Sequence, residues 1–136
     1  MGRFMNIKNI IVEKLILIEP EIELIYLFGS MASNTNKAQS DVDVAFFSQK
    51  KIDNVQRWEI AQSLALVLNM DVDLVNLDEC STVMRFQVVT EGMVLYDKFD
   101  KADMFDTTTI SMYQHLQEAR KPMIDDYMER MSHAKR

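Results

Sequence analysis

The sequence predicts an α+β domain of α/β-like character, in which helices flank a small mixed sheet of about four strands and a helical arm follows. Four short apolar runs have the length and the residue types of strands. Other segments repeat apolar residues every three or four positions, which is typical of helices. A loop joins the first two strand candidates, whereas the later ones alternate with helices, and this pattern predicts a mixed sheet.

The overall composition predicts one domain spanning residues 1–136, with a core at 1–100 and the helical arm at 101–136. A chain of 136 residues that is 48% hydrophobic can bury a substantial core. A net charge of −6 argues against a surface for nucleic-acid backbones, which needs clustered basic residues. One cysteine excludes an internal disulfide and suits the cytoplasm. No apolar run approaches the roughly 20 residues that cross a bilayer, so we expect no membrane association.

The first helix is expected at residues 3–18. Polar residues interrupt its apolar run, which favours an amphipathic helix over a signal peptide, and Pro20 ends it. The first strand is expected at 22–28, and a polar loop at 34–40 leads to the second strand at 41–47.

The next helix is expected at 54–69, with Asp53 as its N-cap. Its predicted apolar face, which includes a core tryptophan, consists of Val55, Trp58, Ala61, Leu64, Ala65 and Leu68. A third strand follows at 71–77. Ser81 is a candidate cap for a helix at 82–91 that ends at Gly92, and a fourth strand is expected at 93–96.

The C-terminal arm is expected to be one long helix or two helices with Pro122 as the breakpoint, because proline lacks an N–H and clashes with the preceding turn. Pro122 also fits the first turn of a second helix. Beyond it lies a narrow apolar stripe of Met123, Ile124, Tyr127, Met128 and Met131. This methionine-rich stripe either packs back on the sheet or docks on another protein.

Two carboxylates in the second strand are candidate metal ligands. Asp41 and Asp43 point to the same face of a strand, because side chains alternate with a period of two. Like charges on a mostly apolar strand repel one another unless a cation neutralises them. Carboxylate oxygens are ligands that Mg²⁺ selects, so the pair predicts a magnesium site.

A Gly-Ser turn precedes this pair, and a third acid follows it. Gly29 permits close backbone approach, and Ser30 offers N–H and hydroxyl groups to a phosphate. Asp73 lies in another apolar strand and can complete a three-carboxylate cluster that holds two metal ions or accepts a proton. Asp71 has the same parity and is the rival of Asp73.

Together, Gly29-Ser30, Asp41-Val42-Asp43 and Asp73 resemble the signature of the DNA polymerase β-type nucleotidyltransferase superfamily. The short length and the layout are similar to the minimal nucleotidyltransferases, or MNT-domain proteins, which are the antitoxins of HEPN–MNT toxin–antitoxin pairs. The resemblance implies a nucleotidyltransferase fold, Mg²⁺ as cofactor and ATP as substrate. It also implies transfer of AMP to a tyrosine of a HEPN ribonuclease toxin, and a tight hetero-oligomer with that toxin.

The chain departs from the family pattern after the Gly-Ser turn, where Met31-Ala32-Ser33-Asn34 replaces the usual x-Ala-Arg-Gly. We expect the lost arginine to affect nucleotide binding rather than the metal ligands. Two other functions stay open: a non-catalytic antitoxin that acts by binding alone, and a small-molecule nucleotidyltransferase. His115 and His133 lack partners at zinc-like spacing, and the acidic surroundings of Cys80 argue against a nucleophilic thiol.

Overall fold

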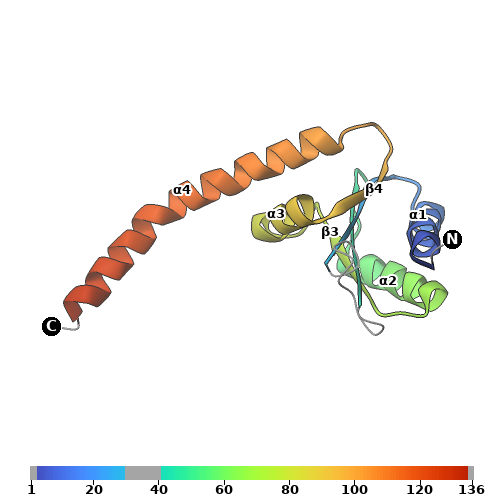
Figure 1. Cartoon of the computed structure of the whole chain (residues 1–136), viewed down its shortest axis with the longest axis horizontal. Coiled ribbons are helices and arrows are strands. Elements are labelled where there is room, and N and C mark those ends of the chain that lie inside the picture. The colour runs from blue at the N-terminus through green and yellow to red at the C-terminus, as the bar shows by residue number, and fades with distance from the viewer. Residues whose placement is uncertain (1–2, 30–40, 135–136) are drawn as a thin grey trace.

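The structure is a computed structural model that describes residues 3–29 and 41–134. Its elements in chain order are α1 (Arg3–Ile18), β1 (Ile22–Phe28), β2 (Val42–Ser48), α2 (Asn54–Leu68), β3 (Val72–Asn76), α3 (Thr82–Glu91), β4 (Met93–Asp97) and α4 (Ala102–Ala134) (Figure 1). The predicted loop at 34–40 lies outside the described residues. Within the described part, no helix is long and apolar enough to cross a membrane.

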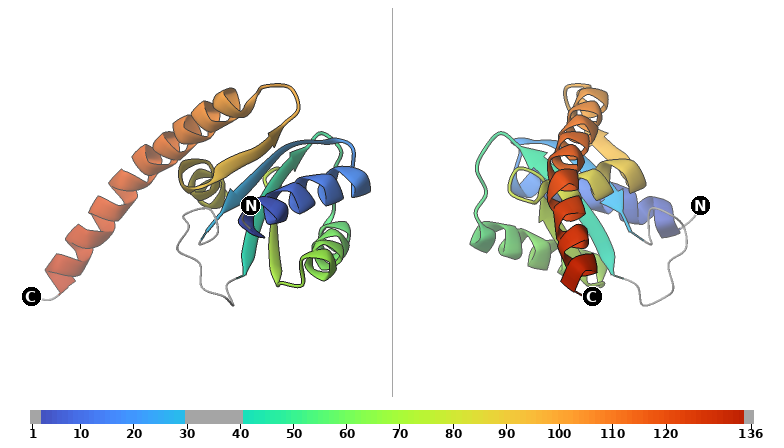
Figure 2. Two further views of the ribbon diagram at one scale, coloured as in Figure 1. Left: turned by 45° about the vertical axis from the view of Figure 1, so that its right-hand side comes forward. Right: turned by 90° about the vertical axis from the view of Figure 1, so that its left-hand side faces the viewer.

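The four strands form one mixed sheet in the order β3-β2-β1-β4, which confirms the predicted class. β1 pairs antiparallel with both β2 and β4, whereas β2 pairs parallel with β3. Side chains of α1 and α2 join one core cluster on one face of the sheet, and side chains of α3 and of the start of α4 join a second cluster on the other face. Figure 2 shows this layered arrangement, with α4 continuing outward from the domain.

The helix caps follow the sequence closely. Asp53 accepts a hydrogen bond from the N–H of Gln56, whose side chain in turn accepts one from the N–H of Asp53, so a full capping box begins α2. The Ser81 side chain accepts a hydrogen bond from the N–H of Met84 and so caps the start of α3. Gly92 ends α3 as predicted, but its backbone is extended rather than left-handed. A Cβ there would lie 2.4 Å from the Val88 carbonyl oxygen, so close packing is what requires glycine.

The predicted burial of Trp58 is wrong, because Trp58 is 58% exposed. The buried residues of α2 are Ile60, Ala61 and Leu64, and the half-buried Arg57 reaches the Leu74 carbonyl oxygen at 3.0 Å. Each helical residue turns the side chain by about 100°, so Trp58 points away from this face. The apolar pattern of α2 is broad, and the sequence alone did not identify which part faces the sheet.

The arm is a single helix, α4, and Pro122 lies inside it, so the two-helix alternative is wrong. The apolar stripe does not pack back on the sheet, since its five residues are 42–72% exposed. Figures 1 and 2 show the C-terminal half of α4 extending away from the rest of the molecule. Among the described residues, the arm is therefore attached to the domain through the first half of α4.

A hydrogen bond and an aromatic cluster attach α4 to the sheet. The hydroxyl of Tyr26 in β1 donates to the Asp106 carboxylate at 2.6 Å. The ring of Phe105 contacts those of Tyr26 and Phe47, and the Arg85 guanidinium lies 4.9 Å from its centroid. Burial raises the pKa of both Tyr26 and Asp106, and the tyrosine hydrogen bond partly offsets the shift at Asp106. These contacts set the direction in which the arm leaves the domain.

We expect Tyr26→Phe to lower the free energy of unfolding by about 1 kcal/mol near neutral pH, because the Asp106 carboxylate loses its donor. Without this donor the pKa of Asp106 rises further. The folded protein then holds that proton more tightly, so the deficit develops as pH rises through the pKa of Asp106. Urea unfolding at about pH 7 and at about pH 3 measures the difference, on either side of the usual aspartate range. Tyr113→Phe, which preserves the stacking on Phe86, is the control, and equal deficits at both pH values would contradict the account.

Candidate active site

The candidate site lies at one end of the sheet, where three strands place it. Asp43 in β2 pairs in register with Phe28 in β1 on one side and with Asp73 in β3 on the other. Asp41 precedes β2 by one residue. The sheet therefore brings Asp43 beside Asp73, although the two residues are 30 positions apart in the sequence.

The acids belong to the face of the sheet that carries α3 and α4. Alternation places Asp43 on the side of Ala45 and Phe47, and it places Asp73 on the side of Val75. All three apolar residues belong to the core cluster that α3 and α4 cover. Asp41 and Asp73 are exposed, whereas Asp43 is half-buried. The site thus combines one half-buried carboxyl group with two that are exposed to solvent.

The electrostatics of the site centre on Asp43. Burial raises the pKa of its carboxyl group most, and the negative charges of Asp73 and Asp41 raise it further. The ionised form of Asp43 is therefore less favourable than that of an aspartate in water. A bound cation would compensate both the desolvation and the repulsion, and this is the physical argument that the site suits a metal.

Gly29 leaves room for this carboxylate. It has a φ of +74°, which L side chains rarely adopt. A Cβ at this position would lie 2.1 Å from Oδ2 of Asp43 and 3.0 Å from its Cγ. The sequence predicted a phosphate-binding turn here, and the structure adds that Gly29 is required for the placement of Asp43. Ser30, the other predicted phosphate contact, lies outside the described residues.

The structure distinguishes Asp73 from its rival Asp71. Asp73 pairs with Asp43 in register, and its charge acts on the Asp43 carboxyl group. Asp71 precedes β3, and its backbone carbonyl accepts a hydrogen bond from the N–H of Val42 at 2.9 Å. The contacts therefore favour Asp73 as the third carboxylate, with Asp71 serving the strand pairing.

The donor set consists of hard oxygens, which fit Mg²⁺ or Mn²⁺ rather than zinc. Among the described residues, no three acidic, histidine or cysteine side chains converge closely enough to form a ready metal cage. Neighbouring carboxylates repel one another, and a bound cation would offset that repulsion. Mg²⁺ commonly retains several waters and substrate oxygens, so it needs only one or two protein carboxylates. The acids thus fit a metal that arrives with its substrate.

The weaker candidates have structural contacts. Burial raises the pKa of the Cys80 thiol, while Arg85 lowers it, so burial rather than acidic neighbours disfavours the thiolate. Nδ1 of His115 lies 2.9 Å from the Ser111 carbonyl oxygen within α4. Nε2 of His133 lies 3.8 Å from a carboxylate oxygen of Glu129, also within α4. These contacts give the three side chains no evident part in the acidic site.

Known proteins with similar sequences belong to the nucleotidyltransferases. The model of the family described as Polymerase beta, Nucleotidyltransferase matches residues 6–101. A curated relative, the protein adenylyltransferase MntA of Shewanella oneidensis, is 49% identical over 109 residues, which are 80% of this chain and 78% of the relative.

Solved structures agree in fold and in length. A crystal structure of a toxin–antitoxin with AMP-PNP has a TM-score of 0.82 and 46% identity, and the match covers 89% of this chain and 98% of that one. A structure of tri-AMPylated Shewanella oneidensis HEPN toxin in complex with MNT antitoxin has a TM-score of 0.78 and 43% identity. That match covers 92% of this chain and 98% of the other.

We expect Asp43→Asn to raise the melting temperature of the metal-free protein at neutral pH by a few degrees, because it removes a desolvated charge that two neighbouring acids repel. Added Mg²⁺ should stabilise the natural chain and leave the variant unchanged. Thermal melts with and without Mg²⁺ measure both effects. Asp71→Asn, which changes an exposed neighbouring carboxylate, should behave like the natural chain. A lower melting temperature for Asp43→Asn would overturn this account.

We expect Gly29→Ala to destabilise the fold by about 1–2 kcal/mol through its positive φ, and by more through the clash with Asp43. The double variant Gly29→Ala with Asp43→Ala removes the clashing atoms and should recover the second part. A double-mutant cycle from urea unfolding measures this coupling. Additive effects would show that the two residues do not contact each other.

Proposed function

Because the chain belongs to the polymerase β-type nucleotidyltransferase family, we propose that it transfers AMP from ATP to a tyrosine of a HEPN-type toxin, with Mg²⁺ at the acidic residues. It is an antitoxin and a protein adenylyltransferase. The single observation that carries this proposal is that the sheet places Asp43 next to both Gly29 and Asp73. The relatives support the same chemistry, since one is a protein adenylyltransferase and another was solved beside a tri-AMPylated toxin.

In this proposal Asp41 and Asp43 hold the metal, and the backbone at Gly29 and Ser30 receives the phosphates. Bound Mg²⁺ would neutralise the charge that develops on the phosphate oxygens. The sheltered position of Asp43 strengthens its interaction with a cation, because water screens it less than it screens an exposed carboxylate. Gly29 lets the triphosphate approach the strand end without a side chain in between.

Asp73 faces the acceptor. Its exposed carboxylate can take the proton from the tyrosine hydroxyl, while the phenolic oxygen forms a bond to the α-phosphorus of ATP. The bond from the α-phosphorus to the bridging oxygen breaks, and pyrophosphate leaves with that electron pair. The products are AMP-tyrosine and pyrophosphate. We place this reaction in the cytoplasm, where ATP is available and a lone thiol stays reduced.

The test uses the full chain with the HEPN-type protein encoded by the neighbouring reading frame, together with ATP and Mg²⁺. Intact-mass measurement should show AMP on the toxin with the natural chain, and at least a hundredfold slower labelling with Asp41→Asn plus Asp43→Asn, since charged-ligand removal costs several kcal/mol. The matched control is Asp71→Asn with Asp78→Asn, which changes two exposed acids that flank β3 and should label normally.

Two results would contradict the proposal. The first is undiminished labelling of the toxin by the variant that lacks both acids. The second is neutralisation of toxin activity by that variant without any adduct, which would establish an antitoxin that acts by masking alone. Labelling of a small hydroxylated acceptor with no protein partner present would instead identify a small-molecule enzyme.

A further inference from the structure

The buried face of α4 continues beyond the domain. In the first half of the helix the covered positions are Ala102, Phe105, Asp106, Thr109, Tyr113 and Leu116, which are buried or half-buried. Their spacing of three or four residues keeps them on one side of the helix. Ala102 and Phe105 pack into the core, and the ring of Tyr113 stacks on Phe86 of α3 at 3.8 Å. This side of α4 therefore faces α3 and the sheet.

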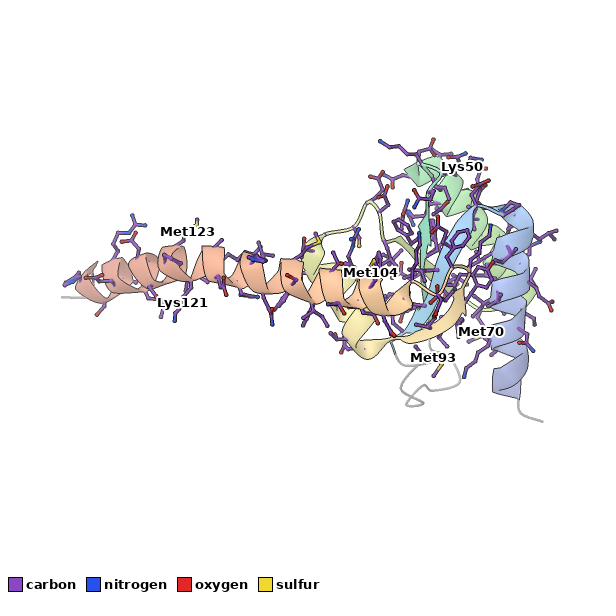
Figure 3. All side chains as sticks on the ribbon, turned by 90° about the horizontal axis from the view of Figure 1, so that it is seen from above. Lys50, Met70, Met93, Met104, Lys121 and Met123 are labelled. Carbon is purple, nitrogen blue, oxygen red and sulfur yellow. The ribbon has the colours of Figure 1, made fainter. Side chains whose placement is uncertain are left out.

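The same side carries the apolar stripe in the second half. From Leu116, further steps of three or four residues lead through Arg120 to Met123, Tyr127 and Met131. Ile124 and Met128 widen the stripe on one flank. Figure 3 shows Met123 and Lys121 on different sides of the arm, as their separation of about 200° around the helix requires. The stripe is thus an extension of the packed face past the end of α3, and it has no cover within the described residues.

This extended face lies on the side of the sheet that holds the acids. Asp43 and Asp73 belong to the face covered by α3 and α4, so a protein seated on the stripe stands on the acids' side of the molecule. A protein acceptor must reach the acids from this same side, so the position of the stripe suits the docking of a substrate protein.

We propose that the stripe Met123, Ile124, Tyr127, Met128 and Met131 docks on an apolar helical face of the HEPN-type toxin and holds its acceptor tyrosine toward the acids. This inference rests on the proposed function for the identity of the partner. Antitoxin chains solved with toxins match 89–92% of this chain, which is more than the family region at 6–101. The matched part therefore includes residues of α4.

The composition of the arm suits docking. Methionine adapts to irregular surfaces, and tyrosine is common among the residues that dominate binding energy. Pro122 removes a backbone hydrogen bond from the middle of α4, and helices without tertiary packing are marginal in water. A partner that binds the stripe would pack against the C-terminal half of α4, which the described residues of the domain do not contact.

The test compares two alanine pairs, both of which keep the helix propensity high. Met123→Ala with Tyr127→Ala truncates two large side chains of the stripe. Asp125→Ala with Glu129→Ala changes the opposite side of the same turns. Titration calorimetry with the HEPN-type protein of the neighbouring reading frame should show at least tenfold weaker binding for the first pair and no change for the second. Labelling by the stripe variant should slow at limiting toxin and recover at saturating toxin, whereas binding of Mg²⁺ and AMP-PNP stays unchanged.

Each other outcome is decisive. Unchanged toxin binding by the stripe variant overturns the inference. A natural chain that is dimeric alone, and that the stripe substitutions turn into a monomer without weakening toxin binding, assigns the stripe to a second copy and also overturns it. If the natural chain binds the toxin through the stripe but transfers no AMP, the docking inference stands and the proposed function fails.

Discussion

The register of β2 between its two neighbours is the constraint on which the site depends. β2 pairs antiparallel with β1 and parallel with β3, so Asp43 comes to lie between Phe28 and Asp73. Buried side chains enforce this register, because a slip of one residue would exchange the two faces of the strand. Val42 and Val44, both fully buried on the α1–α2 side, would then be displaced from the core. The apolar residues of β2 thus hold the carboxylates in position.

The two faces of the sheet have different tasks. The face covered by α1 and α2 contains most of the buried apolar side chains, and it stabilises the strands against movement. The other face is covered by the short α3 and only the beginning of α4. The acids lie at its open edge, where a substrate can approach them. A sheltered carboxylate with raised pKa is tolerated there because the opposite face provides the stability.

Much of this arrangement could be predicted from local patterns. The alternation of the acids along apolar strands and the caps Asp53 and Ser81 act through neighbours in the sequence. Gly29 is indicated by the turn that follows a strand, although the Asp43 carboxylate that requires it comes from another strand. The predictions failed where contacts between residues far apart in the sequence determine the structure. The exposure of Trp58 depends on which side of α2 meets the sheet. The anchoring of the arm depends on the Tyr26–Asp106 hydrogen bond between residues 80 positions apart, and no local pattern indicates such a pair.

Because α4 is continuous through Pro122, the length of the arm also determines the direction in which the stripe faces. Each residue advances the helix by about 1.5 Å and turns it by about 100°. One residue inserted between Leu116 and Met123 would rotate the stripe more than a quarter turn away from the acids. Seven inserted residues would carry it about 10 Å outward with almost the same heading. Insertions and deletions in the arms of related chains should therefore add up to nearly whole helical turns. The distance of the stripe from the domain can then vary while the stripe keeps facing the same side.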